Sequence, residues 1–211
     1  SSITPFLSGD IKVDKHHYVT KPASREDLLI DTRNFFVYVE GKGAYSLTRS
    51  LDSSTSVVDA GPLWHKLTST DTFFGVEVSA LIFVPVSGEN VELMRVSVTN
   101  KASAILMITP TVNIPIFGRG LSNKHDHEHV TALLQRIEQL PEGVLVSPTM
   151  MFNEEGHRRC EAVYFVLGKD GQGKNPVGSF PTVESFCGKA GTLAAPEAVC
   201  SNYETAALPT E

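Results

Sequence analysis

The sequence is organised as a series of short runs of β-branched and aromatic residues separated by turn residues, and no other feature constrains the fold as strongly. The longest run covers residues 72–86, and others follow at 91–99, 104–113, 144–151 and 162–167. Runs joined by short turns are typical of antiparallel strands, because parallel pairing needs long crossover connections. The pattern therefore predicts a mainly β protein, an antiparallel β-sandwich rather than a βαβ fold.

A β-hairpin is predicted near the start of this series. Its two arms, residues 35–40 and 44–49, flank the turn Gly41-Lys-Gly43. Glycine readily adopts the backbone conformations that tight hairpin turns require. We therefore expect the two arms to pair with each other.

One segment departs from the β pattern. Between residues 124 and 140 the apolar residues recur at helical spacing, Pro141 follows, and Asn123 is a potential cap. This combination predicts one amphipathic helix over about 124–140, lying against the sandwich. The apolar residues of the stripe are Val130, Leu133, Leu134, Ile137 and Leu140.

The ends of the chain differ from its middle. Residues 1–33 show little periodicity and predict an irregular N-terminal extension, whereas residues 34–211 form the expected sandwich domain. From residue 168 the chain is rich in Gly, Pro, Ala and Ser, which predicts loops. Neither end carries a closing strand or a cap, so we expect a fragment truncated at its C-terminus. The loops are expected to be anchored by Phe180, Phe186 and Tyr203.

Charge and composition exclude several classes of function. The net charge is −6, which argues against nucleic-acid binding because a phosphate backbone needs clustered Lys and Arg. The apolar runs are too short to cross a bilayer, so no membrane partner is expected. The odd, sparse set of cysteines is typical of reduced thiols, which favours a cytoplasmic location. The three are Cys160, Cys187 and Cys200.

The densest group of chemically useful residues lies in the segment 114–129. His125 and His129 stand four residues apart, a spacing found in zinc sites, but no fourth ligand is evident and no metal is expected. Alternatively, Arg119 projects from the turn Gly118-Arg-Gly120 toward sugar hydroxyls or phosphate. A third interpretation is structural, with turn residues and helix caps and with histidines bonded to backbone carbonyls.

Trp64 is the only tryptophan in the chain. An exposed indole stacks on the apolar face of a pyranose, whereas a buried one anchors a loop in the core. The sequence leaves both interpretations open. The candidate substrate-binding residues are Arg119, Asn123, His125, His129 and Trp64, and no catalytic residue is assigned.

Four blocks together resemble one protein family. They are residues 33–46 (RNFFVYVEGKGAYS), 64–66 (WHK), 73–78 (FFGVEV) and 117–136 (FGRGLSNKHDHEHVTALLQR). They are similar to the N-terminal domain of β-glucan phosphorylases of glycoside hydrolase family 94, formerly glycosyltransferase family 36. The nearest likeness in character is to the 1,2-β-oligoglucan phosphorylase branch.

The resemblance implies a β-supersandwich of the galactose-mutarotase-like type. In the family this domain precedes a catalytic (α/α)6 barrel and contributes to a homodimer. The family reaction is inverting phosphorolysis of a β-linked gluco-oligosaccharide to α-glucose 1-phosphate, with inorganic phosphate as substrate and no cofactor. The chain would then be a non-catalytic carbohydrate-binding and dimerisation domain. The alternatives are a stand-alone mutarotase-like enzyme, or a carbohydrate-binding module, using the histidine cluster, or a purely structural dimerisation domain.

Overall fold

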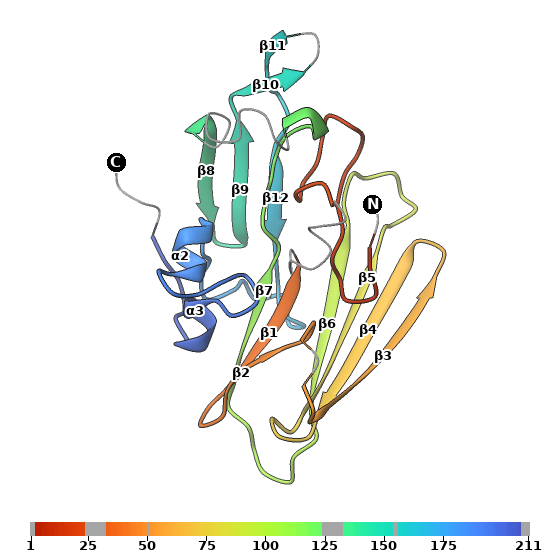
Figure 1. Ribbon diagram of the computed structural model, residues 1–211, viewed down its shortest axis with the longest axis vertical. Helices are drawn as coiled ribbons and strands as arrows, with labels where there is room; N and C mark the ends of the chain where they lie inside the picture. Colours follow the sequence, from red (N-terminus) through yellow and green to blue (C-terminus); the bar gives the residue numbers. More distant parts are fainter. Residues whose placement is uncertain (1–2, 24–32, 50, 124–132, 154–155, 208–211) are drawn as a thin grey trace.

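A computed structural model describes residues 3–23, 33–49, 51–123, 133–153 and 156–207. The protein is mainly β with antiparallel sheets, as the sequence predicts. The described part also contains two short helices, over 183–187 and 197–200, where the sequence analysis expected loops. Figure 1 shows the sheets arranged side by side along the long axis of the molecule.

The largest sheet is a meander of strands that follow one another in the chain. It contains β3 (Ser54–Gly61), β4 (Trp64–Asp71), β5 (Val76–Phe83) and β6 (Leu93–Asn100) in that order. Alternate residues of β4 and β5 are buried, because successive side chains of a strand point to opposite faces. One face of this β3–β6 sheet therefore points into the core and the other points outward.

The second layer is built around the predicted hairpin. β1 (Asn34–Val39) pairs with β2 (Gly43–Ser46) on one side and with β7 (Ile108–Asn113) on the other. Side chains of β1 and β2 pack against β4 and β5, so the two sheets enclose one apolar core. Its buried members are Leu7, Phe35, Val37, Val39, Tyr45, Leu47, Leu67, Phe74, Val76, Val78, Ala80 and Ile82.

The opposite face of β1 is covered by the C-terminal helices α2 (Val183–Cys187) and α3 (Glu197–Cys200). Phe36 meets Phe186 with ring centroids 6.3 Å apart, and Phe186 meets Phe180 at 5.6 Å. Phe180 and Phe186 thus anchor the C-terminal region, as expected. Tyr203 was expected to do the same, but its side chain is 52% exposed.

The expected helix over 124–140 is wrong for residues 135–140, whereas Leu133 is helical. Strand β8 (Gln135–Leu140) pairs over its whole length with β9 (Gly143–Pro148), which also pairs with β12 (Tyr164–Leu167). Five apolar positions do not separate a helical period from a strand period, and a proline can end a helix or occupy a hairpin turn. Residues 135–140 form a strand because they pair with β9. Residues 124–132 lie outside the described part of the chain.

Smaller elements complete the fold. They are the hairpin β10 (Met150–Asn153) and β11 (Gly156–Arg159), and the 3₁₀ turn η2 (Leu121–Asn123). Within the described ranges, no helix has the length and apolar character needed to cross a membrane.

Candidate functional site

The N-terminal segment folds onto the loop that contains Arg119. The Tyr18 amide donates to the Arg119 carbonyl at 3.0 Å, and the Leu121 amide donates to the Lys15 carbonyl at 2.8 Å. The two backbones approach so closely at Gly120 that a Cβ there would lie 3.3 Å from the Cα of His16. Residues 10–20 and 117–123 together form what we call the Tyr18–Arg119 site.

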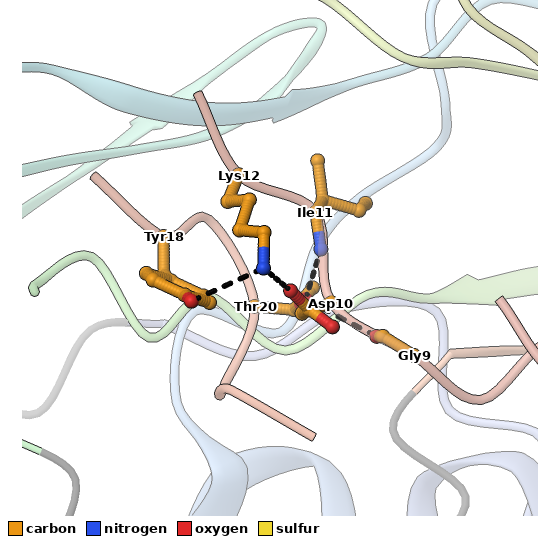
Figure 2. Close-up of polar contacts among 6 residues, drawn as sticks. All are labelled: Gly9, Asp10, Ile11, Lys12, Tyr18 and Thr20. Carbon is orange, nitrogen blue, oxygen red and sulfur yellow. Dashed lines mark hydrogen bonds and ion pairs between the residues drawn. The ribbon is translucent and has the colours of Figure 1, made fainter. Parts of the chain in front are cut away.

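A charged network lies on the N-terminal side of this site (Figure 2). Lys12 Nζ is 2.8 Å from Asp10 Oδ2 and donates to the hydroxyl of Tyr18 at 3.2 Å. The hydrogen bonds to Asp10 and then to Tyr18 raise the pKa of Lys12. Lys12 therefore stays protonated near neutral pH, where it serves as a hydrogen-bond donor and not as a base.

Thr20 fixes the backbone of residues 9–11, next to this network. Its hydroxyl accepts a hydrogen bond from the Ile11 amide at 2.8 Å and donates to the Gly9 carbonyl at 3.4 Å (Figure 2). Asp10 is buried, with only 6% of its side chain exposed, whereas Lys12 is 37% exposed at the side chain. The Lys12 side chain is thus partly exposed while its ammonium is held by Asp10 and Tyr18.

Arg119 does not project freely from its turn. Its Nε donates to the Phe117 carbonyl at 3.1 Å, and its guanidinium lies 4.5 Å from the centre of the Phe117 ring. The same carbonyl accepts a second hydrogen bond from Gln135 Nε2 at 2.8 Å. Arg119 is half-buried, so the turn positions its guanidinium in one orientation instead of leaving it mobile.

The other candidate residues fall in different places. Asn123 is buried at 3% exposure within η2, where its amide donates to the Gly120 carbonyl at 3.1 Å. It lies in the Tyr18–Arg119 site together with Arg119. Trp64 lies on the outward face of the β3–β6 sheet, on a separate element. His125 and His129 lie outside the described residues.

The structure contains a buried ion pair that the sequence did not predict. Arg33 is fully buried and donates through Nη1 to Glu92 Oε1. Burial lowers the pKa of Arg33, while the carboxylates of Glu92 and Asp10 raise it. Asp10 thus acts electrostatically on Arg33 as well as on Lys12. Arg33 and Glu92 are 59 residues apart, so no local pattern could have revealed the pair.

His65 lies near the same ion pair, on the core side of β4. Among the residues that the structure describes, neither of its ring nitrogens has a hydrogen-bond partner. Burial lowers the pKa of His65, and the charge of Arg33 lowers it further. His65 is therefore neutral at physiological pH, and it is a buried residue of the core.

Two charged side chains of the Tyr18–Arg119 site, Lys12 and Arg119, are hydrogen-bond donors. Within residues 3–23, 33–49, 51–123, 133–153 and 156–207, no three His, Cys, Asp or Glu side chains gather to hold a metal ion. The Tyr18–Arg119 site offers the ammonium of Lys12 and the guanidinium of Arg119, both fixed by neighbouring groups, and the buried Tyr18 hydroxyl is one of the groups that fix Lys12. Such groups bind hydroxyls and anions.

No family model matches the chain, and no curated protein is significantly similar to it.

Proposed function

We propose that this chain is the non-catalytic N-terminal domain of a β-glucan phosphorylase, with a galactose-mutarotase-like supersandwich fold. In this proposal it binds a β-linked gluco-oligosaccharide and contributes to a homodimer. A catalytic (α/α)6 barrel of the same polypeptide then carries out inverting phosphorolysis in the cytoplasm, with inorganic phosphate as substrate. The motif blocks at 33–46 and 117–136 support the proposal.

One structural observation carries the binding part of this proposal. The Tyr18–Arg119 bridge joins the second block to the Lys12–Asp10 network, so polar groups from two distant segments face the same region. Lys12 is 37% exposed at its side chain and donates hydrogen bonds, whereas Tyr18 is buried at 4% exposure and its hydroxyl helps to hold the Lys12 ammonium in place. The hydroxyls of a sugar can accept the hydrogen bonds that Lys12 and Arg119 donate.

The proposed activity is tested by measuring phosphate release from α-glucose 1-phosphate with sophorose as acceptor. The chain alone should be inactive, and the full-length protein that contains it should be active. Phosphate release by the chain alone would contradict a non-catalytic role. A full-length protein inactive on every β-glucan tried would contradict the phosphorylase assignment.

The binding role is tested separately by calorimetry with β-1,2-linked gluco-oligosaccharides. Lys12→Met should weaken binding several-fold, because it removes the ammonium from the site. Lys101→Met is the matched control, since Lys101 is a similarly exposed lysine just after β6 that pairs with Glu77 at 3.2 Å. Equal affinities for both variants would remove the Tyr18–Arg119 site from the proposal.

A further inference from the structure

The outward face of the β3–β6 sheet carries an apolar row at its hairpin end. Trp64 lies directly opposite Gly61 on one side and Phe83 on the other, and Phe83 lies opposite Leu93. Residues directly opposite in antiparallel strands point to the same face. Because His65 is buried in the core, the neighbouring Trp64 side chain must lie on the outward face, where it is half-exposed.

The indole of Trp64 leans across the sheet onto β3. A Cβ added to Gly61 would lie 2.7 Å from indole Cε2 and 3.0 Å from Cζ2, so the ring occupies the space that a side chain at residue 61 would need. Glycine at this position therefore allows the ring to lie down beside the strand. The ring packs against Gly61 of β3 and remains partly exposed to solvent.

The hairpin turn beside Trp64 is both strained and apolar. Leu63 has a φ of 64°, a left-handed conformation that is unfavourable for a residue other than glycine. Its side chain is 62% exposed, so it gains little from burial. Pro62 followed by a left-handed residue is typical of a type II turn, where glycine or asparagine is usual. A strained and exposed leucine beside the indole does little to stabilise the fold. It therefore indicates a surface that contacts another molecule.

A polar row lies two residues further along the strands, roughly 7 Å away. Lys66 is opposite Asp59 on β3 and Leu81 on β5, and Leu81 in turn is opposite Arg95 on β6. The side chains of Asp59, Lys66 and Arg95 are exposed, and among the described residues none of the three makes a hydrogen bond or an ion pair. Their donors and acceptors are therefore available to a ligand.

We infer that this face is a second glucan-binding surface, distinct from the Tyr18–Arg119 site. A sugar ring stacks on the exposed part of the Trp64 indole beside Leu63, and hydroxyls of the neighbouring unit bond to the polar row. The mixture of one carboxylate and two cations suits an uncharged polyol, whose hydroxyls donate to Asp59 and accept from Lys66 and Arg95. The choice of a β-glucan as ligand rests on the proposed function.

Because Trp64 is the only tryptophan, its fluorescence reports on this surface directly. Titration of the full chain with β-1,2-linked gluco-oligosaccharides of increasing length should give a saturable change in Trp64 emission. The change should be retained in Lys12→Met, which alters only the other site. An unchanged emission spectrum at sugar concentrations that saturate a calorimetric signal would overturn this inference and leave the proposed function standing. No signal by either method would overturn both.

Variants test the same surface without fluorescence. Trp64→Ala should weaken calorimetric binding at this surface by about ten-fold, and Trp64→Phe by less, because a smaller ring still stacks. Phe73→Ala is the matched control, since Phe73 is an exposed aromatic residue in the β4–β5 turn, at the other end of the sheet. Equal binding by all three variants would overturn the inference. So would a wild-type dimer, detected by light scattering, that Trp64→Phe dissociates, because the surface would then bind a second copy.

Discussion

Tyr18 and Arg119 lie opposite each other in an antiparallel bridge, although 101 residues separate them in the chain (119 − 18). The bridge places the Lys12–Asp10 network next to the Arg119 turn, with Gly120 passing within van der Waals distance of the His16 backbone. The N-terminal segment is thus part of the site and not an appendage to it. Leu7, from the same segment, is fully buried in the core.

The Arg33–Glu92 pair should be sensitive to the loss of either partner. Glu92→Gln removes the ion-pair partner of the fully buried Arg33 guanidinium and leaves Asp10 as its carboxylate, which should lower the free energy of unfolding by about 3 kcal/mol. Urea denaturation measures the change. The double variant Arg33→Met, Glu92→Leu should recover much of the loss, because it removes both charges. A single variant as stable as the wild type would contradict the burial of the pair.

His65 should make the fold sensitive to acid. Burial and Arg33 lower its pKa in the folded chain below the ordinary value of 6.5, so the unfolded chain binds the proton more readily. Stability is therefore complete above about pH 6.5 and decreases as the pH falls below that value. The slope of unfolding free energy against pH between 7 and 5 should be smaller in His65→Gln. An identical slope in both proteins would show that His65 does not contribute.

Two glycine substitutions separate backbone strain from steric clash. Gly41 has a φ of 76° with nothing within 4 Å of an added Cβ, so Gly41→Ala should cost roughly 1 kcal/mol. Gly143 has a φ of 153°, and its added Cβ would meet β12 backbone, including the Cα of Leu167 at 3.1 Å. Gly143→Ala should therefore cost clearly more in chemical denaturation. Equal costs would contradict the β8–β9–β12 arrangement.

The three thiols should differ in reactivity. Cys200 is exposed, whereas Cys160 and Cys187 are buried, and burial raises the pKa of both buried thiols. Titration with a thiol-reactive disulfide reagent at pH 8 should show one fast equivalent and two slow ones. Cys200→Ser should abolish the fast phase. A fast phase that survives in this variant would mean that Cys160 or Cys187 is accessible.

Much of the β architecture was predictable because its signals are local. The hairpin around residues 41–43 and the strands near 76–83 and 93–100 follow from alternation and turn residues. The helix prediction failed for residues 135–140 because their apolar positions fit both a helical and a strand period. Only the pairing with β9 distinguishes the two. Candidate site residues were found where a residue type is rare, as with Trp64, or where glycines flank a charge, as with Arg119.

Local sequence thus established that the chain forms antiparallel sheets, since alternation and turn chemistry act over a few residues. It could not establish which side chains meet. The pairing of Arg33 with Glu92, the bridge between Tyr18 and Arg119, and the position of the Trp64 indole over Gly61 all depend on strand register and on how the layers pack. These contacts join segments distant in the chain or on adjacent strands, and their energies become available only when the whole core has formed.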